Sequence, residues 1–241
     1  MAYRLDEGLE FLQYIDDKSL DTLVEILIRD KDGKLRYTET ITNNELYKKH
    51  SPNHSKYWEV IAGELQTFGG NTFVNVLRGG KGVLYKEILC DVCDKMKINY
   101  NKNANIVTIE KNMFMKILED SLDQMSEEDL KVVIEELGLK TQSFTSEAVM
   151  GALQIAIKQS GFMAYKIAVI VANAIAKMIL GRGLTFAGNA ALTRTIGVFA
   201  GPIGWVITGL WTAIDIAGPA YRVTIPSVIQ VAFLRQQYLN K

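Results

Sequence analysis

Apolar side chains recur at helical spacing along most of this chain. Five segments carry them on one face: residues 4–15, 19–29, 55–68, 84–96 and 106–125. A face that repeats about every 3.6 residues is typical of an amphipathic helix packed against a core. The pattern therefore predicts a helical bundle in the first 140 residues.

Turn chemistry indicates where several of these helices begin and end. The pair Gly69-Gly70 is expected to end the helix that starts near residue 55. Ser126, with Asp129 three residues later, resembles a capping box, in which the two residues bond reciprocally at the start of a helix. Gly138 is a suitable stop for that helix.

Extended structure is expected in one short segment only. Residues 34–42 alternate weakly and carry three Thr, which predicts an extended connector or one isolated strand. None of the four prolines falls between residues 53 and 201, so the strongest helix breaker is missing from the middle of the chain. The predicted fold class is all-α.

The pattern changes beyond residue 140. Residues 145–160 are still amphipathic, but residues 161–180 are apolar except for Lys166, Asn173 and Lys177. These three lie at i, i+7 and i+11, which places them on one narrow stripe of a helix. We expect that stripe to reach water or an acidic patch of the first 140 residues.

A second apolar segment, residues 197–214, contains no charge. Both apolar segments reach the lower limit of length for crossing the hydrocarbon core of a bilayer. Lys166 and Lys177 oppose spanning, because each costs about 3 kcal/mol near the centre of a membrane helix. Pro202 opposes it in the second segment. A buried helical hairpin is the favoured interpretation, and conditional insertion and permanent spanning remain alternatives.

Candidate contacts with a membrane or a partner segment lie in this half of the chain. A GxxxG motif at Gly197 and Gly201 permits close approach of another helix. Trp side chains anchor helices at membrane interfaces, and Lys side chains are attracted to anionic lipid. The candidate contact residues are therefore Lys166, Lys177, Trp205 and Trp211.

Charge is balanced overall but unevenly distributed. Residues 1–140 hold 25 Asp or Glu and 19 Lys or Arg, whereas residues 141–241 hold 2 acids and 8 bases. The two parts are chemically different and are expected to attract each other. Three regions follow: an N-terminal helical segment with its connector at 1–54, a helical region at 55–140, and an apolar Gly/Ala-rich helical region at 141–241.

The expected compartment is the cytoplasm. The first residues show neither the basic and apolar regions of a secretory signal nor the acid-free, Arg-rich character of a transit peptide. With two cysteines, a disulfide framework is implausible. A peripheral or conditionally inserted state at the inner membrane stays open. The bases of the second part are spread through apolar sequence, so no nucleic-acid partner is expected.

The only candidate metal ligands with suitable spacing are two pairs. Cys90 and Cys93 lie about one helical turn apart, and His50 and His54 form the only His pair. Together they would supply the number of ligands that a Cys₂His₂ zinc site needs. However, their order is inverted relative to a zinc finger, and Pro52 interrupts the His pair. We interpret the cysteines as packing residues and expect no metal and no cofactor.

The sequence Arg78-Gly79-Gly80-Lys81-Gly82 follows a short predicted helix at 71–77. Cations and flexible backbone before a helix can bind an anion, so Arg78 and Lys81 are candidates for an anion-binding turn. The sequence is not a P-loop, because Gly82 stands where Ser or Thr would hold magnesium. A tight turn is the favoured interpretation. The chain contains no GxSxG or HExxH motif, and no catalytic residue is assigned.

Long strings of residues resemble one bacterial family. These strings are IAGELQTFGG at 61–70, LRGGKGVLYKEIL at 77–89, and AYRVTIP at 220–226 with its continuation to Arg235. They resemble the YaaW-type proteins, and with the Leu-rich opening at 9–12 the resemblance covers nearly the whole chain.

That family is grouped, on a helical region, with the ubiquinol–cytochrome c chaperones, which assist assembly of a membrane respiratory subunit. Here the corresponding region is roughly 57–140. The resemblance implies a non-enzymatic helical chaperone-like or adaptor protein that binds a hydrophobic or membrane-protein partner, and it transfers no site residue. The alternative is a conditional membrane-permeabilising protein with a shielded apolar hairpin. An enzyme that uses the glycine-rich turn is third.

Overall fold

The structure is a computed structural model, and it describes residues 3–30, 32–72, 82–184, 193–214 and 221–240. Within these ranges the fold is all-α, as predicted, and β pairing is limited to one isolated bridge between Arg29 and Leu35. The bridge lies at the start of the expected connector, residues 34–42, which forms no helix. Arg78 and Lys81, with most of the short helix expected at 71–77, lie outside the described residues.

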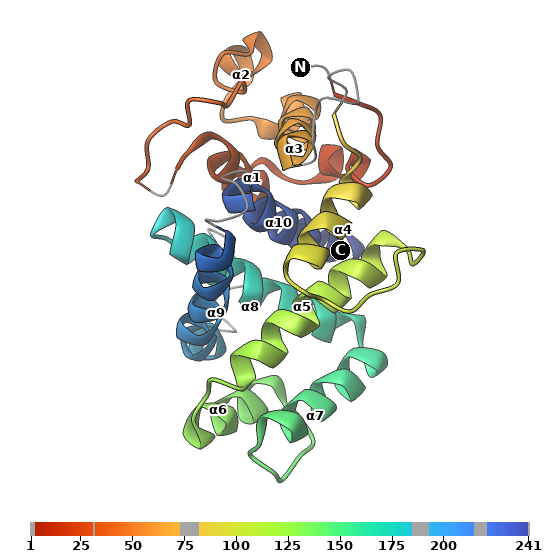
Figure 1. Cartoon of the computed structure of the whole chain (residues 1–241), viewed down its shortest axis with the longest axis vertical. Coiled ribbons are helices and arrows are strands. Elements are labelled where there is room, and N and C mark those ends of the chain that lie inside the picture. Colours follow the sequence, from red (N-terminus) through yellow and green to blue (C-terminus); the bar gives the residue numbers. More distant parts are fainter. Residues whose placement is uncertain (1–2, 31, 73–81, 185–192, 215–220, 241) are drawn as a thin grey trace.

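The helices follow one another along the chain with short connections (Figure 1). They are the 3₁₀-helix η1 (Glu10–Tyr14), α1 (Asp17–Ile28), α2 (Glu45–His50), the 3₁₀-helix η2 (His54–Tyr57), α3 (Trp58–Thr72), α4 (Tyr85–Lys95), α5 (Ile106–Leu122), α6 (Glu127–Leu137), α7 (Ser146–Gln159), α8 (Gly161–Leu180), α9 (Thr193–Ile214) and α10 (Tyr221–Leu239).

Side-chain caps fix several helix starts. Ser126 and Asp129 form the predicted capping box at the start of α6, and Gly138 ends that helix with a left-handed φ of 64°. Asn105 caps α5 by accepting a hydrogen bond from the backbone N–H of Thr108. These local signals act over a few residues, which is why the sequence is sufficient to locate them.

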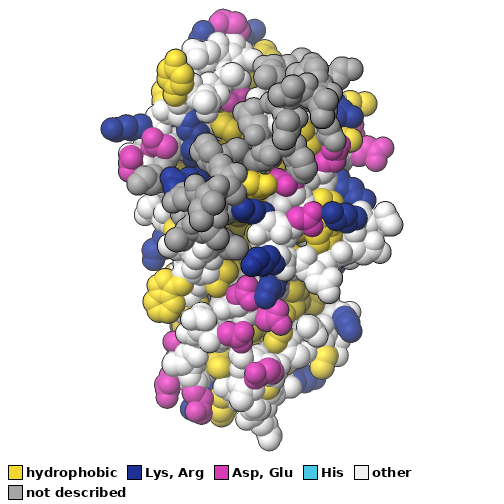
Figure 2. All heavy atoms as spheres, viewed as in Figure 1, with side chains coloured by type: hydrophobic (Ala, Val, Ile, Leu, Met, Phe, Trp, Pro, Cys, Tyr) yellow, Lys and Arg dark blue, Asp and Glu magenta, His cyan; other side chains and the backbone are white. Residues whose placement is uncertain are grey.

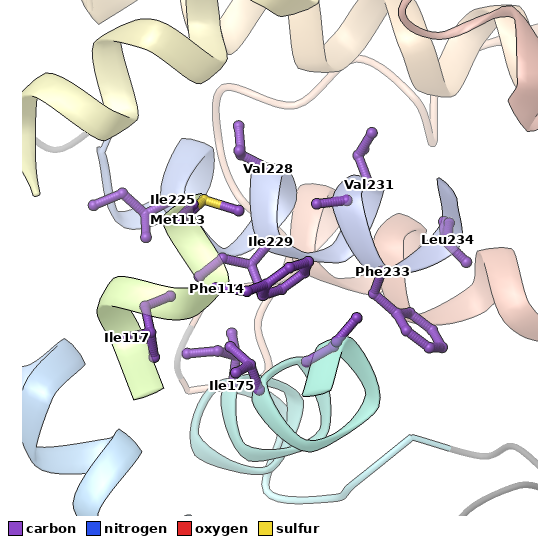
Figure 3. Close-up of a cluster of buried hydrophobic side chains, with 14 of the residues drawn as sticks. Met113, Phe114, Ile117, Ile175, Ile225, Val228, Ile229, Val231, Phe233 and Leu234 are labelled. Carbon is purple, nitrogen blue, oxygen red and sulfur yellow. The ribbon is translucent and has the colours of Figure 1, made fainter. Parts of the chain in front are cut away.

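Helix α10 lies at the centre of the molecule. It contacts α1, α3, α4, α5 and α8, and every side chain from Val223 to Gln237 is buried (Figure 1). In Figure 3, Phe114 of α5 and Ile175 of α8 approach Ile229 of α10. The buried apolar cluster also draws residues from all three sequence regions, 1–54, 55–140 and 141–241.

The expectation that Gly69-Gly70 ends a helix is wrong, because α3 continues through both residues to Thr72. The glycines are needed for packing. A Cβ built on Gly69 would lie 2.5 Å from Cγ1 and Cδ1 of Ile88 on α4. Glycine therefore permits α3 and α4 to approach closely, a tertiary requirement that the local sequence does not show.

The prediction of a helix at residues 4–15 is also wrong for most of that segment, since only Glu10–Tyr14 is helical, as a 3₁₀-helix. The buried Asp6 explains the difference. Its carboxylate accepts hydrogen bonds from the backbone N–H groups of Gly8 and Tyr85, so this segment is fixed to α4 in an irregular turn. Asp side chains that bond nearby backbone compete with helix formation in this way.

Helix α8 spans Gly161–Leu180, as the sequence predicts. The prediction that its three polar residues share one face that reaches water is wrong. Lys177 is exposed and Lys166 is half-buried, whereas Asn173 is buried. The Asn173 Oδ1 accepts a hydrogen bond of 2.9 Å from the backbone N–H of Leu184. Asn173 therefore secures the chain after α8 and does not reach water.

Among the described helices, α8 is long and apolar enough to cross a membrane. In the structure, 67% of its most apolar window is buried, as in the core helix of a soluble protein. It packs against α9, which continues through Pro202, and also against α5, α7 and α10.

Candidate partner-binding cleft

A hollow on the surface lies between the ends of α4 and α5 and the side of α9. It is a cleft of about 560 Å³. Its lining residues are Lys95, Lys97, Asp120, Asp123, Gln124, Trp205, Val206 and Gly209. Figure 2 shows Lys or Arg and Asp or Glu side chains gathered on this face over α5 and the end of α4, beside a hydrophobic group over α9.

Helix α9 presents Trp205 to this cleft because one face of the helix is buried in the core and Trp205 lies on the other face. Its inner face buries Phe199, Ile203 and Ile207 in the core. On its other side Gly201 is exposed, and Trp205 is 65% exposed. A large aromatic ring flanked by residues without bulk is accessible to a partner from several directions.

The opposite wall of the cleft is charged and of mixed sign. Lys97, two residues after the end of α4, has a φ of 56°, a left-handed conformation, so the chain turns away directly after the helix. The Lys95 Nζ lies 5.4 Å from the centre of the Tyr221 ring, which restrains it as a cation–π contact.

Asp120, a carboxylate of this wall, forms an ion pair with a lysine of its own helix. The Lys116 Nζ lies 2.5 Å from its Oδ1, one turn earlier on α5. This bond raises the pKa of Lys116, and it holds Asp120 in place at the edge of the cleft. The cleft thus offers an apolar side at α9 and a polar side with both charges, an arrangement suited to an amphipathic segment.

The other sequence candidates lie elsewhere or outside the description. Lys166 lies near the start of α8, with its Nζ 5.4 Å from the ring centre of Phe162, and Lys177 lies eleven residues further along the same helix. Trp211 belongs to α9, but its side chain is outside the described residues. Of the candidates, Trp205 alone is known to line the cleft. The charged wall was missed, since its residues come from α4 and α5 and share no local motif.

The Cys and His pairs are not brought together as ligands. Cys93 is buried in the core, where burial raises the pKa of its thiol to about 12. His54 is buried too, and its ring nitrogens bond to the Tyr57 hydroxyl and to Asp21 Oδ1. Within the described part of the chain, no three His, Cys, Asp or Glu side chains form a group that could hold a metal ion.

A buried polar cluster that the sequence analysis did not find joins α10 to α5. The Arg235 Nε donates to both carboxylate oxygens of Glu110 at 3.0 Å, and the Tyr85 hydroxyl donates to the same carboxylate at 2.7 Å. Arg235 also donates to the backbone oxygen of Gly8 and lies over the ring of Phe11. Burial raises the pKa of Glu110, although Arg235 and Tyr85 act in the opposite direction.

Ion pairs connect the acidic and basic parts of the chain, as their charges predict. Arg182, just after α8, lies 3.0 Å from Asp21 Oδ2 and 2.5 Å from Glu25 Oε2 on α1. Hydrogen bonding to His54, together with Arg182, lowers the pKa of Asp21. The end of α8 is therefore attached to an acidic face of α1.

Comparison with known proteins gives two family matches and several full-length relatives. Residues 3–37 match a domain of unknown function, DUF3944, and residues 53–230 match the ubiquinol-cytochrome C chaperone family. A UPF0174 protein of Helicobacter pylori strain J99 is 53% identical over 236 residues, which cover 98% of this chain and 93% of the relative. The UPF0174 protein YaaW of Escherichia coli K12 is 31% identical over 239 residues, covering 97% and 95%. No solved structure matches the chain.

Proposed function

The chain belongs to the UPF0174 family, as its resemblance to YaaW-type proteins predicts, and from this premise we propose that it is a non-catalytic, chaperone-like protein that binds a hydrophobic partner segment in the cleft beside Trp205. The match of residues 53–230 to the ubiquinol-cytochrome C chaperone family supports the chaperone-like role. The cytoplasm, at or near the inner membrane, is the proposed location, and a membrane-protein segment is the proposed partner.

The observation that carries this proposal is the open cleft with an exposed Trp205 on one side and Lys95, Lys97, Asp120 and Asp123 on the other. In the proposed complex Trp205 packs on an apolar side chain of the partner, and exposed aromatic residues of this kind often supply much of the binding energy. The charged residues bind polar groups that flank the apolar stretch. The volume of about 560 Å³ accommodates a few side chains, not a folded domain.

A direct test measures binding of a fluorescent apolar peptide with lysine and glutamate at its ends, by fluorescence anisotropy. Trp205→Ala is expected to raise the Kd about tenfold or more, because it removes the central apolar contact. Tyr37→Ala is the control: Tyr37 is an exposed aromatic residue too, but it lies in the connector after α1. The control variant should bind as the unmodified protein does.

Equal binding by the Trp205 and Tyr37 variants would place the peptide elsewhere and refute the cleft as the site. Charge reversal at Lys97 gives a second readout. Lys97→Glu should weaken the binding of peptides with acidic ends more than the binding of peptides with basic ends, since only the acidic ends lose an attraction to Lys97. No dependence on the peptide's end charges would argue against the mixed-charge wall as a binding surface.

One observation favours the second candidate, a conditional membrane-permeabilising protein. The span-length helix α8 is enclosed by α5, α7, α9 and α10, as a shielded membrane segment would be before release. Release of a trapped dye from lipid vesicles separates the two functions. Leakage at neutral or mildly acidic pH supports permeabilisation, and binding without leakage supports the chaperone-like role.

A further inference from the structure

Exposed aromatic and aliphatic side chains gather where the start of α8 meets the end of α10. Tyr14 is 61%, Phe162 56%, Tyr238 38% and Leu239 56% exposed. We call these four residues the end patch. They lie in η1, α8 and α10, and none of these three elements contributes a residue to the cleft.

Several contacts hold the elements of the end patch together. The rings of Tyr14 and Tyr238 stack with their centres 5.9 Å apart. A Cβ built on Gly161 would lie 3.7 Å from Oδ1 of Asn240, which brings the first turn of α8 against the last residues of α10. These contacts bring three segments that are distant in sequence to the same end of the molecule.

Basic residues lie beside the α8 side of the end patch. Lys166 covers the ring of Phe162, and Lys158 is exposed four residues before it. Lys111 on α5 shares a small apolar cavity with Ala164 of α8 and Gln236 of α10, so it faces the same junction.

Acidic residues are scarce on the α7, α8 and α10 side of the end patch. Helices α8 and α10 contain no Asp or Glu, and the single acid of α7, Glu147, is in its first turn, at the far end from Lys158. The acids near the end patch lie on the Tyr14 side: Glu10 is half-buried one turn before Tyr14, and Asp16 and Asp17 begin α1 just after it.

We propose that the end patch docks this protein on an anionic lipid surface, with Phe162, Tyr238 and Leu239 entering the headgroup region and Lys111, Lys158 and Lys166 facing lipid phosphates. Aromatic side chains favour the membrane interface, and Lys beside them adds attraction to anionic headgroups. The protein lies on the membrane and does not span it, since α8 keeps its buried contacts.

The shape of the surface selects lipid over a protein partner. The four apolar side chains are exposed near the ends of their elements, and lysines of α5, α7 and α8 lie beside the α8 side of the patch, which suits insertion between headgroups. A protein partner of the kind proposed for the cleft would need a concave site. Docking through the end patch leaves the Trp205 cleft available for a membrane-protein segment, although it does not depend on the function proposed for that cleft.

The two lysines of α8 provide a matched pair for the test. Lys166 belongs to the basic end, whereas Lys177 lies near Arg182, which is bound to Asp21 and Glu25 on the acidic face of α1. The same substitution on the same helix should therefore have different effects. In this proposal Lys177 does not contact the membrane, so its substitution serves as the control.

The experiment is flotation of the full-length protein with phosphatidylcholine vesicles that contain or lack phosphatidylglycerol. The unmodified protein should float with anionic vesicles, and raised salt should release it, because salt screens the lysine–phosphate attraction. Lys158→Glu with Lys166→Glu should lower the partition coefficient about tenfold or more. Lys177→Glu should change it less than about twofold.

The apolar contribution is tested separately. Phe162→Ser with Leu239→Ser should reduce flotation with anionic vesicles, while Tyr37→Ser, a substitution of a more exposed aromatic residue away from the patch, should not. Trp205→Ala should leave flotation intact, so failure of the cleft proposal and failure of lipid docking are distinguishable. Circular dichroism of each variant establishes that the fold is retained.

Three results would overturn lipid docking. The first is absence of the unmodified protein from the anionic vesicle fraction. The second is equal flotation of the Lys177→Glu variant and of the variant that combines Lys158→Glu with Lys166→Glu. The third is a dimer in light scattering that Phe162→Ser with Leu239→Ser dissociates, which would make the end patch an interface between two copies of this chain.

Discussion

Glu110 and Arg235 are charged side chains buried in the core, and each offsets the cost of burying the other. Each would carry a large desolvation penalty alone, and together with Tyr85 and the backbone of Gly8 they satisfy one another's hydrogen bonds. The contact joins residues 125 positions apart, so it specifies how the last helix aligns with α5. Such a pair contributes mainly to a unique arrangement, since burying charges adds little net stability.

Arg235→Met should therefore destabilise the protein by about 3–5 kcal/mol, because it leaves the Glu110 carboxylate buried without its partner. Glu110→Leu with Arg235→Met should cost clearly less than the sum of the two single changes. Urea unfolding followed by circular dichroism gives the three values. Additive effects would mean that the two side chains contribute independently.

Asp21 predicts a dependence on pH. Its pKa is lowered in the folded state by hydrogen bonding to His54 and by Arg182, so the folded state binds its proton less readily than the unfolded chain does. The stabilisation is present above the unfolded pKa of about 4 and is lost as the pH falls through the folded value. The difference in unfolding free energy between the unmodified protein and Asp21→Asn should therefore be larger at neutral pH than at pH values of about 3.

That difference should stay below about 1 kcal/mol, because the Asp21 side chain is 37% exposed and water screens its contacts. Guanidinium chloride would screen the ion pairs, so urea is the suitable denaturant. A difference that grows as the pH falls would show that the sign assigned to Asp21 is wrong.

At the scale of elements, the approach of α3 and α4 depends on one missing side chain. Gly69→Ala should destabilise the protein by about 1–3 kcal/mol, because the new Cβ meets the buried Ile88 side chain. Gly151→Ala on α7 is the control, since a Cβ there meets nothing within 4 Å. The control should gain up to about 1 kcal/mol from helix propensity. If both variants gained stability, Gly69 would have no packing role.

Helix α8 gives a stronger prediction. Ile170 and Ile175 are 0% and 1% exposed, so Ile170→Asp or Ile175→Asp would bury an unpaired carboxylate and should abolish cooperative thermal unfolding. Ile155→Asp on α7, where the side chain is 58% exposed, should leave the melting temperature nearly unchanged. Cooperative melting of either α8 variant would indicate that α8 leaves the core.

The helices with a clear apolar face could be predicted from sequence, and those shaped by tertiary contacts could not. The predicted ranges for α1, α4, α5 and α8 agree with the structure to within a few residues, since their periodicity and caps are local. The glycines of α3 could not be interpreted correctly, because Gly69 is needed for close packing against Ile88 and not as a helix stop. The irregular first residues of the chain could not be predicted, because Asp6 accepts a hydrogen bond from the distant Tyr85.

The candidate cleft shows the same limit. Trp205 could be selected because a Trp in an apolar, charge-free helix is conspicuous. Lys97 and Asp123 look like ordinary surface charges in sequence, and only the crossing of α4, α5 and α9 brings them opposite Trp205. Likewise Lys166 and Lys177 share a stripe in sequence but have different electrostatic surroundings in the fold.

For the whole molecule, the decisive feature is that the last helix is the innermost one. A chain that ends at residue 220 should fail to fold, because it leaves the buried faces of α1, α3, α4, α5 and α8 without α10. A chain that ends at Gln237 loses only the exposed end of α10 and should fold with reduced stability. Binding of a dye specific for exposed apolar surface, together with circular dichroism, distinguishes the two. Native-like melting of the shorter chain would mean that α10 is not required for the core.

The central position of α10 also affects how the protein is made. A ribosome releases the C-terminal residues last, so the nascent chain has α1 to α9 outside the ribosome before α10 is free to join them. During that interval the face of α8 that α10 covers is exposed, and Glu110 of α5 lacks its Arg235 partner. The newly made protein is therefore itself a chain with an exposed hydrophobic segment, and its own folding must compete with aggregation and with capture by the membrane until synthesis ends.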